Sequence, residues 1–358
     1  SWEEALAFTA GRLAGFKGAE IAALAGELCD TESMVALRDL MHAIGSENLD
    51  CRTDGSRFDT SVPAGYLFNS GIAGIDEADA ILIVGCNPRR EGTLVNARIR
   101  KNWLEKRIKI GVIGEAADLT YPYEHLGTGP EDLEKLMRAC SGFAKILKDA
   151  ERPMLIVGSA VFARGDGEEI HALLYECAVT RGFIKENWNG FNVLHRAASR
   201  AAGLQTGFLP GKNGKGFHDI LAGTRDGSIK AVYLLGVDEF DARKEIGWQT
   251  FVIYQGHHGD FGAHRADVIF PGAAYTEKDG LYMNTEGRVQ LAKKAVFPPG
   301  EAREDWKIVR ALSGALDKTL AYDTLAQLRE RIVKDHPQFA KIDAKPEREW
   351  KAFGNKGK

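Results

Sequence analysis

Cysteine is scarce in this chain of 358 residues, and no two cysteines lie close together. The five are Cys29, Cys51, Cys86, Cys140 and Cys177. The cysteines of disulfide frameworks, and the ligands of zinc sites and iron–sulfur clusters, typically recur at short local spacings. We therefore expect no disulfide and no cluster in this chain, and reduced thiols are typical of a cytosol-like compartment.

An excess of charge of one sign is also missing. The chain carries 47 Lys and Arg against 50 Asp and Glu, a net charge of −3, so no global basic field attracts it to nucleic acid or anionic lipid. Long hydrophobic runs are absent as well, because a run such as Ala80–Val84 is far shorter than the ~20 residues that span a bilayer. We expect no nucleic acid partner and no direct membrane insertion.

The sequence does contain a series of short apolar runs that each end in or beside glycine. They are rich in Val, Ile and Leu without alternation, which is typical of parallel strands buried on both faces. Stretches of helical period separate them, so the sequence predicts an α/β fold with doubly wound sheets. The glycines at the ends of the six runs are Gly85, Gly114, Gly158, Gly236, Gly256 and Gly272.

The length leaves room for about two domains at the usual ~150 residues per domain. A weak internal repeat supports this, since ADAILIVGCNPRREGTLVNARIRK and KAVYLLGVDEFDARKEIG both combine a strand, a glycine, an Asn or Asp at the turn and a charged helix. We predict one discontinuous module formed by residues 1–45 and 151–310, and a second module inserted in it at residues 46–150. Residues 311–358 are predicted to be a C-terminal helix and a surface tail.

The turn after the run at Ala80–Val84 carries side chains suited to an anionic ligand. Gly85 permits close backbone approach, and Asn87 can cap a helix or contact a ligand. Arg89 and Arg90 can meet a phosphate at the carboxyl end of a strand. The same residues also suit an ordinary βα turn in which Asn-Pro starts a helix, and both interpretations stay open.

The loop after the run at Phe251–Gly256 contains His257, His258, Asp260 and His264. Imidazole and carboxylate are competent metal ligands, but adjacent histidines on an extended backbone point in opposite directions. Structural hydrogen bonding is therefore the prediction for this loop. The chain also lacks a GxSxG nucleophile motif, and we predict no catalytic residue.

Longer segments carry a family resemblance. GSENLDCRTDG, WNGFNVLHRAASRAAG, QGHHGDFGAHRADVIFPG and PGAAYTEKDGLYMNTEGRVQ resemble the large iron–sulfur subunits of respiratory complex I, NADH:quinone oxidoreductase. The TEKDG and NTEGRVQ patterns belong to the wider molybdopterin oxidoreductase superfamily, which includes formate dehydrogenases. GHHGDFGAHRAD and GFNVLHRAASR are similar to the complex I branch, and the resemblance covers nearly the whole chain.

The resemblance implies a fold of two Rossmann-like doubly wound modules of the molybdopterin oxidoreductase (formate dehydrogenase/DMSO reductase) type. In active relatives these modules grip two molybdopterin dinucleotides. By that analogy Gly85, Asn87 and Arg89 form one vestigial nucleotide-binding turn, and Gly236 and Asp238 form the other. We expect no cofactor bound to this chain.

The resemblance also implies where a metal ligand would stand. Active relatives carry a Cys or selenocysteine a few positions beyond a GSENLDC-like segment. After Cys51 this chain has no thiol at the expected place, and Asp54 and Ser56 are the oxygen donors that could replace one. We expect no metal here.

Intact relatives, by the same resemblance, begin with an iron–sulfur domain that relays electrons from NADH toward quinone, and we expect such a domain to precede Ser1. This chain is then a non-catalytic scaffold, enzymatic only as a subunit of the complex. Its expected partners are that domain and other peripheral-arm subunits, on the cytoplasmic face of the bacterial inner membrane or on the mitochondrial matrix side. Two alternatives stay open: a fragment of an active molybdenum or molybdopterin oxidoreductase such as formate dehydrogenase, and a stand-alone nucleotide-binding module using Gly85–Arg90.

Overall fold

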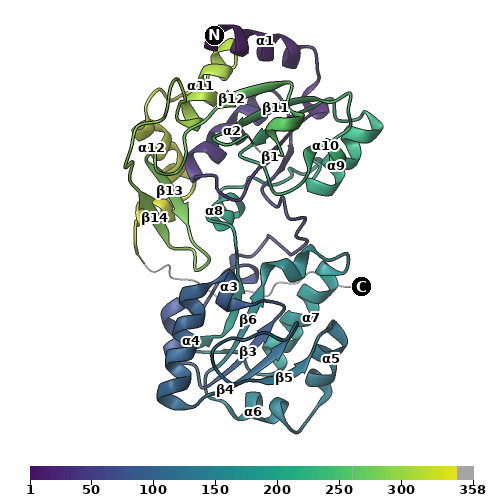
Figure 1. Ribbon diagram of the computed structural model, residues 1–358, viewed down its shortest axis with the longest axis vertical. Coiled ribbons are helices and arrows are strands. Elements are labelled where there is room, and N and C mark those ends of the chain that lie inside the picture. Colours follow the sequence, from purple (N-terminus) through teal and green to yellow (C-terminus); the bar gives the residue numbers. More distant parts are fainter. Residues whose placement is uncertain (260, 345–358) are drawn as a thin grey trace. The chain divides into compact units, whose positions relative to one another are not determined.

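The computed structural model describes residues 1–259 and 261–344, which divide into two compact units, each built on a five-stranded parallel sheet (Figure 1). Unit 1 comprises Ser1–Asp54, Ala197–Asn284 and Arg288–Ala344. The described part of unit 2 comprises Gly55–Arg196 and Thr285–Gly287. The predicted α/β class with doubly wound parallel sheets is confirmed.

The sheet of unit 1 has the strand order β12-β11-β10-β1-β2. β1 and β10 pair in parallel, from Ile21 with Ala231 to Ala25 with Leu235, and both strands are fully buried. Burial on both faces is the environment that parallel strands require. The strands are β1 (Ile21–Ala25), β2 (Asn48–Asp50), β10 (Ala231–Leu235), β11 (Phe251–Gly256) and β12 (Val268–Pro271), and a separate antiparallel hairpin is formed by β13 (Gly280–Met283) and β14 (Val289–Ala292).

Several helices of unit 1 begin at residues whose side chains cap their free amides. Ser1 and Glu4 form a capping box on the first helix, and Thr324 and Gln327 form one on the last. Asp30 caps the helix that follows β1. The helices are α1 (Trp2–Ala14), α2 (Thr31–Ala43), α8 (Arg200–Gln205), α9 (Phe217–Asp226), α10 (Ala242–Glu245), α11 (Asp305–Ala315) and α12 (Leu325–Asp335).

The sheet of unit 2 has the order β5-β4-β3-β6-β9. Its central strand β3 pairs in parallel with β4 on one side and with β6 on the other. The strands are β3 (Ala80–Val84), β4 (Lys109–Ile113), β5 (Glu124–Gly127), β6 (Pro153–Gly158) and β9 (Phe191–Leu194), and a short hairpin is formed by β7 (Ile184–Lys185) and β8 (Trp188–Asn189).

Helices cover both faces of this second sheet. Val95 and Ile99 pack with Ile81 and Ile83 of β3 in one core. On the other face Gly111 of β4 leaves space for the ring of Phe143, to which an added Cβ would come within 2.7 Å. The helices are α3 (Pro88–Glu91), α4 (Thr93–Lys106), α5 (Pro130–Arg138), α6 (Phe143–Asp149) and α7 (Gly167–Thr180).

The predicted module boundaries differ from those of the structure. The sequence predicts residues 151–196 in the discontinuous module, but β6 and β9 complete the sheet of unit 2. Residues 46–54 include β2 and belong to unit 1. Alternation of strands and helices does not reveal which sheet a strand joins, because pairing is non-local. The predicted C-terminal appendage is also part of unit 1 as far as Ala344, and its remaining residues, 345–358, lie outside the described part.

Within residues 1–259 and 261–344, no helix combines the length and the apolar character that crossing a bilayer demands.

The approach of β1 and β10 gives a stability prediction. A Cβ on Gly26 would lie 1.9 Å from the carbonyl oxygen of Gly236, whereas a Cβ on Gly11 in α1 would meet nothing within 4 Å. We expect Gly26→Ala to lower the free energy of unfolding by about 1–3 kcal/mol or more. The control Gly11→Ala should raise it by about 0.5–1 kcal/mol, because alanine favours the helix. Urea unfolding checks both, and a neutral Gly26→Ala would contradict the close approach.

Candidate functional site

Each sheet reverses its strand order at one point, and open α/β sheets bind ligands in the crevice at that point. In unit 1 the reversal lies between the carboxyl ends of β1 and β10, and in unit 2 it lies between those of β3 and β6. A pocket of about 370 Å³ lies at the first point and one of about 870 Å³ at the second. These two pockets, the unit 1 pocket and the unit 2 pocket, are the candidate sites.

The unit 2 pocket contains all three predicted residues of the first turn, Gly85, Asn87 and Arg89. Gly85 has φ +59°, and a Cβ there would lie 2.1 Å from the Val161 side chain, so glycine is required for this close approach. The Asn87 side chain accepts a hydrogen bond from the Arg89 amide at 3.1 Å and so caps α3.

Carboxylates of the chain itself engage the polar groups of this turn. The Asn87 amide donates to Glu91 Oε1 at 2.6 Å. The Arg89 guanidinium donates to Asp118 Oδ2 at 2.6 Å and to the Asp118 carbonyl at 3.0 Å. These bonds are those of the ordinary βα turn that the sequence left open as an alternative. They engage the Asn87 amide and the Arg89 guanidinium, while Arg90 also lines the pocket.

The unit 1 pocket contains the other predicted pair, Gly236 and Asp238. The Asp238 carboxylate accepts hydrogen bonds from the Tyr254 hydroxyl at 2.8 Å and from the Gly262 amide at 3.0 Å. Asp238 therefore ties the loop after β11 to the turn after β10, which is a structural use of the side chain.

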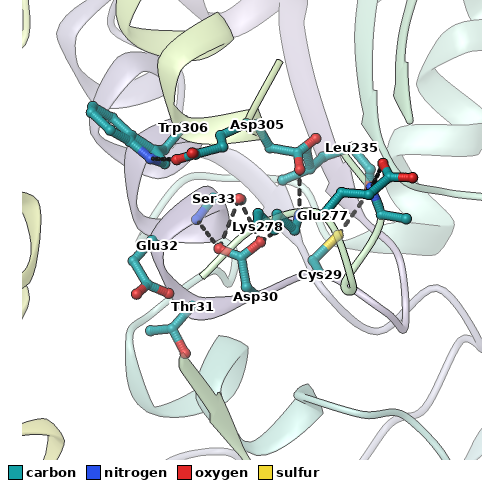
Figure 2. Close-up of polar contacts among 12 residues, drawn as sticks. Cys29, Asp30, Thr31, Glu32, Ser33, Leu235, Glu277, Lys278, Asp305 and Trp306 are labelled. Atoms are coloured by element: carbon teal, nitrogen blue, oxygen red, sulfur yellow. Dashed lines mark hydrogen bonds and ion pairs between the residues drawn. The ribbon is translucent and has the colours of Figure 1, made fainter. Parts of the chain in front are cut away.

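A buried ion cluster adjoins the unit 1 pocket, which Lys278 and Asp305 line. Asp30 pairs with Lys278, and we call Asp30, Lys278 and Asp305 the Lys278 cluster. Figure 2 shows the Lys278 side chain between the two carboxylates. Its ammonium lies 2.7 Å from Asp30 Oδ2 and also forms an ion pair with Asp305. Burial favours the neutral amine, but the two carboxylates outweigh it and hold the pKa of Lys278 well above its usual value.

The Lys278 cluster and its hydrogen-bond partners join α2, α11, β10, β11 and the turn before β13. Asp30 Oδ1 accepts the Ser33 amide at 2.8 Å and caps α2. Gln255 of β11 donates to Asp305 Oδ1 at 2.9 Å and accepts a bond from the Tyr233 hydroxyl of β10. The first turn of α2 follows β1, where Rossmann-like sheets bind phosphate. In this chain the cap of that helix is the chain's own carboxylate.

Glu32 adds a second buried ion pair beside the Lys278 cluster. One of its carboxylate oxygens accepts the Arg329 guanidinium at 2.7 Å, and the other accepts the Leu281 amide at 2.8 Å. Burial and the neighbouring Asp30 charge raise the pKa of Glu32 to about 7, against the opposing effect of these two donors. The pair fastens α12 to α2.

Asp54 and Ser56, the two candidate metal ligands, do not form a metal site in the structure. Asp54 Oδ1 lies 3.0 Å from Nη1 of the buried Arg200, and Ser56 is a buried residue of unit 2. Burial raises the pKa of the nearby Cys51 thiol to about 12, so it stays protonated. Among residues 1–259 and 261–344 no group of three or more His, Cys, Asp or Glu side chains has the geometry of a metal site.

The histidine loop contributes to the unit 1 pocket only in part. His257 and His258 line the pocket, with their rings edge-on and 4.6 Å apart between centroids. His264 is exposed, and Asp260 lies outside the described residues.

Sequence reasoning missed the Lys278 cluster. Lys278 stands in the polar segment that resembles complex I subunits, and Asp30 stands immediately before a helical run, which is a cap signal. Nothing in the sequence joins them, because they are about 250 residues apart. Asp305 carries only the signal of an acidic residue in the first turn of a helix, which does not identify its partner.

Known proteins resemble this chain over most of its length. A family model described as molybdopterin oxidoreductase matches residues 1–315. The 78 kDa subunit of mitochondrial NADH-ubiquinone oxidoreductase of Neurospora crassa is 44% identical over 352 residues, which are 96% of this chain and 46% of that protein. A subunit of the NADH-quinone oxidoreductase of Rickettsia felis is 39% identical over 361 residues, 100% of this chain and 51% of that protein. The chain thus spans about half the length of these curated relatives.

Two solved structures share the fold. One is the formyltransferase/hydrolase complex (FhcABCD) of Methylorubrum extorquens with methylofuran, with a TM-score of 0.65, 17% identity, and coverage of 89% of this chain and 96% of that one. The other is acetylene hydratase of Pelobacter acetylenicus, with a TM-score of 0.61, 14% identity, and coverage of 89% and 59%. At these identities the likeness concerns the fold alone.

The Lys278 cluster predicts a large loss of stability when its cation is removed. Lys278→Met leaves Asp30 and Asp305 as unpaired buried carboxylates, so the free energy of unfolding in urea should fall by about 3–5 kcal/mol. The control Lys293→Met removes an exposed ammonium 3.8 Å from Asp279 and should cost less than about 1 kcal/mol. Equal losses in the two variants would contradict a central role for Lys278.

The raised pKa of Glu32 predicts that the free energy of unfolding depends on pH. Its pKa is raised from 4.5 to about 7 in the folded chain, so the folded state holds a proton that the unfolded state releases. Its contribution is fully present below pH 4.5 and is lost as the pH rises to about 7. Glu32→Gln should therefore flatten the fall of unfolding free energy across this window, by up to about 1.4 kcal/mol per pH unit. The exposed Glu330→Gln should leave the slope unchanged, and identical slopes for wild type and Glu32→Gln would refute this assignment.

Proposed function

The chain belongs to the molybdopterin oxidoreductase family, and from that premise we propose that it is a non-catalytic scaffold region of an NADH:quinone oxidoreductase (complex I) subunit. The support comes from relatives named as subunits of that enzyme and from the way this chain uses its own side chains at the two switch points. The observation that carries the proposal is the occupation of turn and helix-cap amides by carboxylates of the chain.

The family implies a molybdopterin cofactor, whose dinucleotide form has an anionic pyrophosphate. In the unit 1 pocket Asp238, Glu239 and Asp305 oppose a single ammonium, that of Lys278. Glu239 Oε1 also accepts the Glu27 amide after β1, at 2.5 Å. The lining of this pocket has a net negative charge, and the Lys278 ammonium and the Glu27 amide are already bonded to carboxylates of the chain. Binding of an anionic ligand in this partly buried pocket is therefore unfavourable.

In unit 2 the corresponding amide, that of Asn87, already donates to Glu91. A phosphate would have to displace that carboxylate. The residues of the two turns therefore do not fit a pterin dinucleotide, and we assign no redox step to this chain.

The segment where active relatives carry a metal ligand is also built for packing. A Cβ added to Gly203 would lie 2.8 Å from Cys51 Sγ and 3.1 Å from Met34 Sδ, so the Cys51 thiol is enclosed by α8 and α2. Asp54 is paired with Arg200. A thiol that stays protonated and a carboxylate that neutralises a buried guanidinium are poor ligands for a metal.

In the whole subunit, we propose that electron transfer from NADH toward quinone takes place through iron–sulfur clusters in a domain that precedes Ser1. The curated relatives are about twice as long as this chain, which accommodates such a domain. The scaffold would support that domain and contact other peripheral-arm subunits. Its place would be the cytoplasmic face of the bacterial inner membrane, or the matrix side in mitochondria.

One observation favours the alternative, a fragment of an active molybdenum or molybdopterin oxidoreductase. The unit 2 pocket is large, about 870 Å³, and Arg89, Arg90 and Arg164 line it. Guanidinium groups at a switch point suit a nucleotide phosphate. The two functions differ in what the purified protein contains.

Cofactor analysis of the full-length protein, purified from its host, separates the two functions. We expect molybdenum, tungsten and released pterin each far below one equivalent per chain. We also expect no thermal stabilisation by guanine nucleotides, although ligand at a hundred times its dissociation constant would add about 2.7 kcal/mol. One equivalent of pterin with metal would overturn the scaffold proposal in favour of the active oxidoreductase, and nucleotide stabilisation alone would favour a nucleotide-binding module.

A further inference from the structure

Helix α4 of unit 2 is fixed by its inner face. Val95 and Ile99 lie in the core against β3. Two buried amides hold the helix along its length: Asn96 donates to the Leu119 carbonyl at 3.1 Å, and Asn102 donates to the carbonyls of Ile75 and Ala78 at 2.6 and 2.8 Å. The opposite face of α4 is therefore presented outward in a fixed orientation.

That outward face carries apolar side chains where polar ones are usual. Leu94 is 82% exposed and Leu104 is 44% exposed. Ala97 and Lys101 stand between them and are exposed as well. The spacing of three, four and three residues places all four on one side of an α-helix. We call these residues the α4 stripe.

The surroundings of the α4 stripe are strongly basic. Residues 97–109 contain six Lys and Arg against one Glu, in a chain whose net charge is −3. Asp76 serves both Arg98, at 2.7 Å, and Lys101, at 3.9 Å, so this one carboxylate faces two cations. None of these six cations lines the unit 1 pocket or the unit 2 pocket, so neither candidate site accounts for the excess of positive charge.

We propose that the α4 stripe is the docking surface for an acidic amphipathic helix of another subunit, a proposal that rests on the proposed function for the identity of the assembly. Leu94 and Leu104 are about 15 Å apart along the helix axis at 1.5 Å per residue. A second helix packed along α4 would bury both leucines between its own apolar side chains. Asp and Glu on its flanks would pair with Arg100 and Lys101, as flanking charges do in paired helices.

Charge complementarity favours an acidic amphipathic helix over a bilayer or a nucleic acid as the partner of the α4 stripe. A membrane-binding face needs a broad apolar surface, whereas the α4 stripe has two leucines interrupted by a lysine. A nucleic acid would use the cations and leave both leucines in water. The α4 stripe is narrow and apolar with basic residues around it, so it matches a partner helix that has a narrow apolar stripe with acidic residues beside it.

Site-specific photo-crosslinking in the assembled complex tests this surface. The full-length subunit would carry p-benzoylphenylalanine in place of Leu94, or in place of the exposed Val179 of α7 as a comparison site. We expect Leu94 to give one main adduct, mapped by mass spectrometry to a segment with apolar residues at helical spacing and Asp or Glu beside them. The Val179 position should not give that adduct.

A charge reversal adds a second readout. Arg100→Glu with Lys101→Glu should lower the yield of the Leu94 adduct about fivefold or more. Lys145→Glu with Lys148→Glu, the same change on the exposed side of α6, should leave the yield unchanged. The proposal is overturned by an adduct to lipid or nucleic acid, by an adduct to a segment without acidic residues, by no adduct, or by a yield that Arg100→Glu with Lys101→Glu does not change.

The composition of the purified assembly separates this proposal from the previous one. If the subunit does not purify with an NADH:quinone oxidoreductase, the proposed function fails. The same crosslink, in whatever assembly the subunit then enters, still decides whether the α4 stripe docks an acidic helix.

Discussion

Unit 1 depends on one buried ammonium between two carboxylates. Lys278 comes from the turn before β13, Asp30 from the cap of α2, and Asp305 from the first turn of α11. Burying either carboxylate without a partner would destabilise the fold, and the shared ammonium of Lys278 compensates the charge of both. Because Gln255 and Tyr233 extend the network into β11 and β10, the sheet and the elements packed on it are fastened at one point.

That point coincides with the place where a doubly wound sheet offers its helix N-terminus to a ligand. Helix N-termini at such positions are suited to binding phosphate in α/β folds generally. In this chain Asp30 takes the position in unit 1, and Glu91 takes the turn amide of Asn87 in unit 2. Internal carboxylates therefore stabilise the turns at both switch points.

The parts that the sequence predicted are those with strong local signals. All six apolar runs are strands, since continuous Val, Ile and Leu are typical of parallel strands. The expected burial on both faces fails for β12, an edge strand on which Ile269 is exposed. The strand β1 was missed because IAALA is small and alanine-rich, and the boundary at 150 was wrong because β6 joins β3 through non-local pairing. Gly85 was predicted at a switch point from its place after a strand, and Gly236 from the family resemblance. The partners of Lys278 could not be found, because only the fold brings Asp30 and Asp305 to it.

The most direct test is an experimental density map of the intact protein, purified from its host, that resolves side chains at both switch points. The account predicts Lys278 between Asp30 and Asp305, the Glu91 carboxylate on the Asn87 amide, and no density for a dinucleotide in either pocket. Density for a pterin dinucleotide, with Lys278 or Glu91 turned away from these partners, would contradict it.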